Sequence, residues 1–155
     1  MYRLCCRYLK NQFEAEDALV RGFYKVFRSL ATFDYQDDTR LLAWIRRIMV
    51  NECLMQLRQS NSFNFIQLSE EQDFVDQGCT DIESSLSAES IYTLLLELPA
   101  GYRTVFNLFV IEGYSHKEIA EQLEVSEEVS RTQLSRAKAM LRAILTKNNI
   151  RDAIR

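Results

Sequence analysis

The feature that most constrains the fold is a stretch near the middle of the chain without lysine or arginine. Between Gln59 and Ser90 there are seven acidic residues and many Ser, Gln and Asn, and no helical period is sustained. This composition favours a solvated linker over a packed element. Because the chain has 155 residues, the linker predicts two small domains. The acidic residues are Glu70, Glu71, Asp73, Asp76, Asp81, Glu83 and Glu89.

The sequence on either side of this linker has the character of helices. Apolar residues recur at helical spacing, and one proline and four glycines are too few for the turns of a many-stranded sheet. We therefore predict an all-α protein with a domain at 1–59, an acidic linker at 60–86 and a domain at 87–155. With their capping residues, the predicted helices cover 1–9, 14–30, 38–58, 87–98, 100–112, 115–123 and 126–147.

The cysteines and the single histidine do not form a metal-binding or catalytic pattern. Cys5 and Cys6 are adjacent, there is no CxxC pair, and one histidine cannot complete a Cys/His zinc site. We predict that these cysteines, Cys53 and Cys79 are reduced thiols, and that His116 is solvated. Without a nucleophile–base pair or a glycine-rich phosphate loop, we expect neither an enzyme nor a cofactor. No apolar run has the length of a membrane span, so we expect a soluble, cytoplasmic protein.

Residues 114–141 have the pattern of two short helices joined by a tight corner. Ser115 and Glu118 are spaced as a capping box, and Ser126 is placed to cap the final helix. Between them, the first helix ends near Leu123. Glu124 must then adopt a left-handed backbone or shift the corner. The arrangement is typical of a helix–turn–helix that reads DNA.

The final helix has a basic face opposite an apolar one. The predicted core positions are Val129, Ala137, Met140, Leu141 and Ile144. The opposite row consists of Arg131, Ser135, Lys138 and Arg142, with Thr132 and Arg136 beside it. Arginine can bind guanine edges in the major groove, and hydroxyl groups can reach bases or phosphates. The alternative is a face that is merely solvated, but the cap, the corner and the basic helix together favour DNA binding.

The helix from Asp38 or Thr39 to Arg58 carries a second, independent pattern. Arg40, Arg47, Asn51 and Arg58 project within about 20° of one line, and Trp44 lies one turn along the same edge. Cations, an amide and an aromatic ring are what a surface for single-stranded nucleic acid needs. In the alternative interpretation, Trp44 is a core residue and the arginines are ordinary solvated cations.

The helix at 14–30 has an apolar stripe and a mixed outer face. The stripe consists of Ala18, Leu19, Phe23, Val26, Phe27 and Leu30. We predict that Phe23 and Phe27 lie in the core. A partner should be able to reach the outer residues, which are Glu16, Asp17, Val20, Arg21 and Tyr24.

Three blocks, in this order, resemble the extracytoplasmic-function (ECF) sigma factors of bacterial RNA polymerase. EAEDALVRGFYKVFRSL (14–30) is similar to the helix that docks on the polymerase clamp. LLAWIRRIMVNECLMQLR (41–58) is similar to the helix that melts the promoter and reads its minus-10 element. LPAGYRTVFNLFVIEGYSHKEIAEQLEVSEEVSRTQLSRAKAMLR (98–142) is similar to the minus-35-reading domain.

The resemblance implies a role for each set of residues. The minus-35 contacts would be Arg131, Thr132, Ser135, Arg136 and Lys138, and the minus-10 contacts would be Arg40, Trp44, Arg47, Asn51 and Arg58. The polymerase contacts would be Glu16, Asp17, Val20, Arg21 and Tyr24. The implied partners are core RNA polymerase, at its clamp and flap, promoter DNA and an anti-sigma factor. The formal net charge of −3 suits a chain that shares its DNA affinity with a large basic partner.

Three positions depart from the pattern of the family, and two other functions stay open. Arg21 stands where an acidic residue is common, Glu124 where glycine is frequent, and Met55 where many members have a polar residue. The first alternative is a stand-alone helix–turn–helix regulator, which would leave the Trp44 and Asn51 face unexplained. The second is a degenerate sigma-like protein that titrates polymerase or an anti-sigma factor.

Overall fold

The structure is a computed structural model that describes residues 1–59 and 88–153 and, within the second range, the side chains of 91–147. The predicted linker at 60–86, together with Cys79, lies outside the described residues. The chain forms two compact units, one on each side of this gap, and the elements described in both are helical. The prediction of an all-α fold is confirmed for the part that the structure describes.

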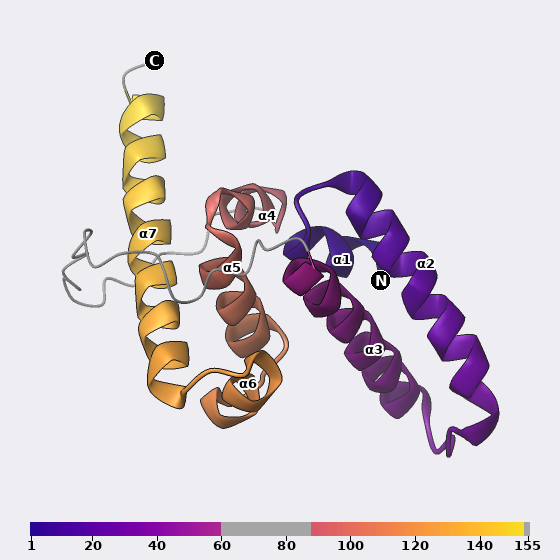
Figure 1. Cartoon of the computed structure of the whole chain (residues 1–155). Coiled ribbons are helices and arrows are strands. Elements are labelled where there is room, and N and C mark those ends of the chain that lie inside the picture. Colours follow the sequence, from indigo (N-terminus) through magenta and orange to yellow (C-terminus); the bar gives the residue numbers. More distant parts are fainter. Residues whose placement is uncertain (60–87, 154–155) are drawn as a thin grey trace. The chain divides into compact units, whose positions relative to one another are not determined.

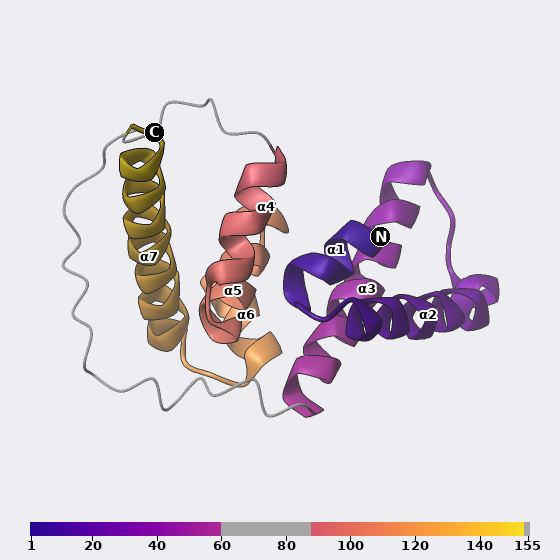
Figure 2. The ribbon, with the colours of Figure 1, turned by 90° about the horizontal axis from the view of Figure 1, so that it is seen from above.

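The first unit is built from three helices (Figures 1 and 2). They are α1 (Tyr2–Tyr8), α2 (Gln12–Ser29) and α3 (Asp38–Gln59), and a short 3-10 turn, η1 (Leu30–Thr32), follows α2. The two long helices lie side by side, and α1 packs against both of them. Buried residues of α1 and α3, among them Leu4, Tyr8, Met49 and Leu54, form the core of this unit.

Small residues on α2 allow α3 to approach closely. The fully or nearly buried positions of α2 are Ala15, Ala18, Gly22 and Val26. A Cβ atom at position 22 would collide with the sulfur of Met49, which is itself 0 % exposed. The distance between two packed helices depends on the side chains at their contact, so these residues set the spacing of α2 and α3.

This spacing corrects the predicted core of α2. Phe27 is 71 % exposed, Leu30 is 46 % exposed, and Phe23 is only partly buried. The prediction that Phe23 and Phe27 are core residues is therefore wrong for Phe27 and only partly right for Phe23. The large apolar residues follow a helical stripe, but the side of α2 that faces α3 has room only for small ones.

The start of α3 also differs by one residue from the prediction. The backbone N–H of Arg40 donates a hydrogen bond of 2.8 Å to Oδ1 of Asp37, and the helix begins at Asp38. Asp37 is therefore the N-cap, and neither Asp38 nor Thr39 has that role. An N-cap side chain bonds the N–H two or three residues ahead, and Asp37 stands three residues before Arg40.

The second unit contains the predicted helix–turn–helix (Figure 1). Its elements are α4 (Ala88–Glu97), α5 (Ala100–Phe106), a π-helical turn η2 (Asn107–Ile111), α6 (His116–Leu123) and α7 (Glu127–Ala153). Leu95, Leu98 and Tyr102 pack around Ala137 of α7, with Met140 and Leu141 at the edge of this cluster. The continuous helix predicted for 100–112 is thus interrupted in its second half, where the N–H of Glu112 bonds the carbonyl of Asn107.

The corner between α6 and α7 has the predicted caps. The Ser115 and Glu118 side chains form a capping box, and Ser126 Oγ accepts from the N–H of Val129 at 3.1 Å. Glu124 takes the left-handed conformation, with φ 57° and ψ 42°. Of the two possibilities at Glu124, the chain therefore adopts the strained backbone.

Replacing Glu124 by glycine should stabilise the second unit by about 1 kcal/mol, because a left-handed residue with a Cβ costs about that much. Urea unfolding followed by circular dichroism measures the change. The matched control is Glu121→Gly, an exposed position inside α6, which should instead destabilise by about 1 kcal/mol. Equal effects of the two substitutions would contradict the strain at Glu124.

The cysteines of the first unit are free thiols. Cys5 and Cys53 are buried on α1 and α3, and Cys6 is partly buried. A hydrogen bond from Cys53 lowers the pKa of Cys5, while that bond and burial raise the pKa of Cys53. The prediction of reduced thiols is confirmed for these three.

Candidate nucleic-acid interfaces

The outer side of α7 presents the predicted basic and hydroxyl row. Arg131, Thr132, Ser135 and Lys138 are exposed, whereas Arg136 and Arg142 are partly buried. The Arg131 guanidinium donates to Oε2 of Glu127, one turn earlier, at 2.7 Å. Because 61 % of this arginine side chain is exposed, the pair is solvated and can exchange for a contact with DNA at little cost.

The inner side of α7 differs from the predicted core. Ala137 is fully buried as predicted, but Val129, Met140, Leu141 and Ile144 are only partly buried. The other buried positions described on this helix are Ser130, Gln133 and Leu134, at i, i+3 and i+4. The polar side chains of Ser130 and Gln133 therefore lie against the rest of the unit. The distribution of apolar residues along the helix did not predict this.

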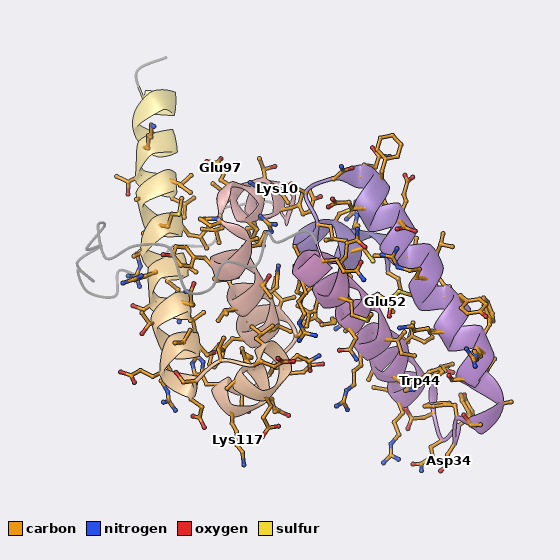
Figure 3. All side chains as sticks on the ribbon, in the orientation of Figure 1. Lys10, Asp34, Trp44, Glu52, Glu97 and Lys117 are labelled. Atoms are coloured by element: carbon orange, nitrogen blue, oxygen red, sulfur yellow. The ribbon has the colours of Figure 1, made fainter. Side chains whose placement is uncertain are left out.

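The predicted line on α3 is present as a mixed surface. Arg40, Arg47 and Arg58 are exposed, and Asn51 is partly buried on the same helix. Trp44 is also partly buried, and it lies toward the N-terminal end of α3, near Asp34 (Figure 3). Trp44 is thus not fully buried, and the exposed arginines fit both interpretations of this line.

The loop before α3 holds two of these side chains. The Phe33 and Trp44 rings stack with centroids 4.5 Å apart and planes 26° apart. Arg40 donates to the Gln36 side chain, and its Nε lies 3.8 Å from Oδ2 of Asp37. Phe33 therefore fixes the orientation of the indole, and Arg40 must leave its loop partners to bind a phosphate.

The outer side of α2 is rich in exposed apolar residues. Phe13, Val20, Tyr24 and Phe27 are between 66 % and 81 % exposed, at i, i+7, i+11 and i+14. Glu16 and Asp17 are exposed beside them. We call these six residues the α2 outer face. Contiguous exposed apolar surface with a charged margin is typical of a protein–protein interface.

Arg21 is paired within the first unit, although 39 % of its side chain stays exposed. Its guanidinium pairs with Asp17 and donates to the Gln56 side chain, and Nε lies 3.7 Å from Oε2 of Glu52. Glu52 is only 3 % exposed between α2 and α3, and it also accepts from Lys25 at 2.5 Å (Figure 3). The cations at 21 and 25 thus balance a buried carboxylate and brace α2 against α3.

His116 is not the solvated side chain that the sequence predicted. Its Nδ1 lies 2.9 Å from Oγ of Ser130, and its ring stacks on Phe109 with centroids 4.4 Å apart. Burial lowers the pKa of His116, and the positive charge of Arg131 lowers it further. The environment of His116 depends on Phe109, seven residues earlier, and on Ser130, fourteen residues later, so no local sequence pattern could reveal it.

The lowered pKa of His116 predicts a pH dependence of stability. The unfolded chain, with a pKa near 6.5, binds the proton more tightly than the folded one. The stabilisation is therefore present above pH 6.5 and is lost as the pH falls below it. Urea unfolding between pH 7.5 and 5.5 should show a smaller loss in His116→Phe than in the wild type. The charged groups near the imidazole are Arg131, Glu127 and Lys138 of α7. Parallel pH profiles would contradict the assignment.

Comparison with known proteins decides what these surfaces belong to. The family model described as Sigma-70 region 2 matches residues 1–63, and the one described as Sigma-70, region 4 matches residues 88–141. The ECF RNA polymerase sigma factor SigE of Mycolicibacterium smegmatis is 33% identical, with 99% of this chain and 60% of the relative covered. The chain is an ECF member of the sigma-70 family.

Other relatives agree with this assignment. SigM of Mycobacterium tuberculosis is 26% identical over 94% of this chain and 71% of the relative, and SigW of Bacillus subtilis is 28% identical over 92% and 81%. The chain thus spans between three fifths and about four fifths of the length of these ECF sigma factors. The sigma factor RpoE of Bartonella quintana, solved in complex with the anti-sigma factor NepR, matches with a TM-score of 0.58 at 21% identity. That match covers 94% of this chain and 89% of the other, and it supports the fold.

Within this sigma-70 family member, the region 4 match contains α6 and the first half of α7, and the region 2 match contains α2 and α3. In the residues that the structure describes, no helix is long and apolar enough to cross a membrane. Among the same residues, His, Cys, Asp and Glu side chains do not gather into a group that could hold a metal ion.

Sequence reasoning missed four residues of these surfaces. They are Phe13 and Phe27 on the α2 outer face, Phe33 behind Trp44, and Ser130, which His116 contacts. A signal was available for Phe27, because Ala15, Ala18 and Gly22 mark the opposite side of α2 as the closely packed one. No comparable signal existed for Phe33 or Ser130.

Proposed function

We propose that this chain is a sigma factor that binds core RNA polymerase and directs promoter-specific transcription initiation in the bacterial cytoplasm. The observation that carries the proposal is that each unit has its own candidate nucleic-acid surface. On α7, the second helix of the capped helix–turn–helix, it is an exposed row of basic and hydroxyl side chains. On α3 it is a line of arginines, an amide and an indole. One surface suits duplex DNA and the other suits separated strands.

Each candidate residue has a proposed role in this scheme. Arg131, Thr132, Ser135, Arg136 and Lys138 contact the minus-35 element. Trp44 and Asn51 engage the opened minus-10 element, while Arg40, Arg47 and Arg58 hold phosphates. The α2 outer face docks on the polymerase, and Arg21 supports it from within the unit. We assign no covalent chemistry to the chain.

An anti-sigma factor is a further proposed partner. The similar sigma factor RpoE of Bartonella quintana was solved in complex with one, NepR. The α2 outer face gives a physical reason for such a partner, because its four large apolar side chains are exposed until a protein covers them.

Arg131→Ala and Arg136→Ala should each weaken promoter selection by about 1–3 kcal/mol if the arginine contacts a base. The fold should survive because 61 % of the Arg131 side chain and 42 % of that of its partner Glu127 are exposed. The measurement is competition between a selected promoter and the same DNA with an altered upstream element, bound by the chain with core polymerase. An unchanged preference in both variants would remove the α7 row from DNA reading.

The experiment that tests the function compares promoter binding with and without core polymerase. The chain alone should bind duplex DNA weakly, because its net charge is negative and its α3 surface needs separated strands. Addition of core polymerase should give tight, salt-sensitive and promoter-specific binding. Nanomolar duplex binding by the chain alone, with no gain from polymerase, would instead favour the stand-alone regulator.

A further inference from the structure

The side chain of His116 lies where three elements of the second unit meet. The residue is the first of α6, its ring stacks on Phe109 of η2, and its Nδ1 lies 2.9 Å from Oγ of Ser130 on α7. The ring planes are 25° apart, so the imidazole is held on one face and at one edge. Its neighbour Lys117 is exposed and extends away from α6 (Figure 3).

Ser130 directly precedes the first residues of the exposed basic and hydroxyl row on α7. It is 0 % exposed, and Arg131 and Thr132 follow directly after it in the helix. Each residue turns an α-helix by about 100°, so the direction of Ser130 determines the directions of both following side chains. A contact that fixes Ser130 toward α6 therefore also fixes the rotation of the proposed DNA-reading row.

The apolar contacts between α6 and α7 are less directional. Ile119, Leu123 and Leu134 are buried, and their apolar burial stabilises the helix pair but depends less on angle than a hydrogen bond does. A hydrogen bond, by contrast, weakens steeply away from its preferred distance and angle. The His116 side chain of α6 and the Ser130 side chain of α7 are joined by such a bond.

We propose that His116 is a positioning residue for promoter reading, and that its hydrogen bond to Ser130 sets the rotation of α7. The residue acts through Ser130 and does not itself touch DNA. This inference rests on the proposed function, because the row that it positions is the proposed minus-35 surface. The hydrogen bond itself can be tested without polymerase or DNA.

Two substitutions separate the hydrogen bond of His116 from its packing. His116→Phe keeps the stack on Phe109 and removes the bond, whereas His116→Asn loses the stack and keeps a polar atom near the place of Nδ1. The DNA probe is the promoter that wild-type chain with core polymerase selects from a random DNA pool. The readout is the preference of that holoenzyme for this promoter over the same DNA with a scrambled upstream element.

His116→Phe should reduce this preference about two- to tenfold, which is the range of one net hydrogen bond, and His116→Asn should retain most of it. Ser130→Ala should reduce it as far as His116→Phe does, and in that background Phe and Asn at 116 should behave alike. The matched control is Glu121→Gln, an exposed position on the same helix, which should leave the preference unchanged. A packing role alone predicts the reverse order, with Phe better than Asn, and that result would overturn the proposal.

A double-mutant cycle in the full chain gives the independent measurement. The urea midpoint of the double variant, His116→Phe with Ser130→Ala, should equal that of the less stable single variant, because both changes remove the same bond. A shift equal to the sum of the two single shifts would show that no bond exists, and would overturn the inference. If wild-type holoenzyme selects no promoter, the proposed function fails instead, and the cycle still decides on the bond.

Discussion

Changing Tyr24 and Phe27 together to serine is expected to weaken binding to core RNA polymerase by about 2–4 kcal/mol, or roughly 30- to 700-fold. Large aromatic side chains near the centre of an interface carry a disproportionate share of binding energy. These two are 66 % and 71 % exposed, so their removal takes little away from the folded chain. The loss should therefore appear in the complex and not in the stability of the first unit.

Titration of labelled chain with core polymerase, without DNA, measures this affinity. The matched control is Leu42→Ala, which removes a 56 % exposed apolar side chain from α3 in the same unit. The control should bind like the wild type, and thermal unfolding should be nearly the same for all three proteins. Wild-type affinity in the double serine variant would show that the α2 outer face is not the docking surface.

The second large effect is expected on α3, where Trp44→Ala and Asn51→Ala should each impair open-complex formation by about 1–3 kcal/mol. A base that leaves the duplex must gain stacking and edge contacts in exchange, and the indole and the amide are the groups on α3 that can supply them. Trp44→Ala also removes the stack on Phe33, so Trp44→Phe is the better test of the ring itself.

Permanganate reactivity of unpaired thymines reports strand opening directly. Polymerase binding should stay at the wild-type level in these variants, because the α2 outer face is unchanged. Arg47→Gln is a useful comparison, since the loss of one exposed cation should weaken the opening modestly and reduce its salt dependence without abolishing it. Unchanged thymine reactivity in both Trp44→Phe and Asn51→Ala would leave the α3 line as an ordinary solvated surface.

The helices, and the caps of the helix–turn–helix, could be predicted from the sequence because local rules determine them. The capping box at Ser115 and Glu118 needs only two residues at the right spacing, and the structure contains it. At Glu124 the sequence left two possibilities open, a left-handed backbone or a shifted corner, and the structure has the left-handed backbone. By contrast, Asp37, Asp38 and Thr39 are adjacent capping residues, and spacing alone could not choose among them.

The errors concern side chains whose environment depends on another helix. The stripe with Phe23 and Phe27 is the most hydrophobic side of α2, but α3 packs on the side with Gly22 because it must approach closely there. Arg21 pairs with Glu52 of α3, 31 positions later in the chain, which the sequence did not predict, while 39 % of its side chain stays exposed. His116 is partly buried because of Phe109 and Ser130. The small residues Ala15, Ala18 and Gly22 were a signal for the packing of α2, but periodicity within one helix contains no information on the contacts of Arg21 and His116.

Run-off transcription with purified chain and core RNA polymerase tests the central claim most directly. The templates are promoters that the complex selects from a random DNA pool, and the same DNA with either element scrambled. The account predicts transcripts of one defined start that require the chain, and that fall when either element is scrambled. A chain that binds polymerase and yet gives no promoter-dependent transcript would contradict it, and would identify a sigma-like protein that only titrates the polymerase.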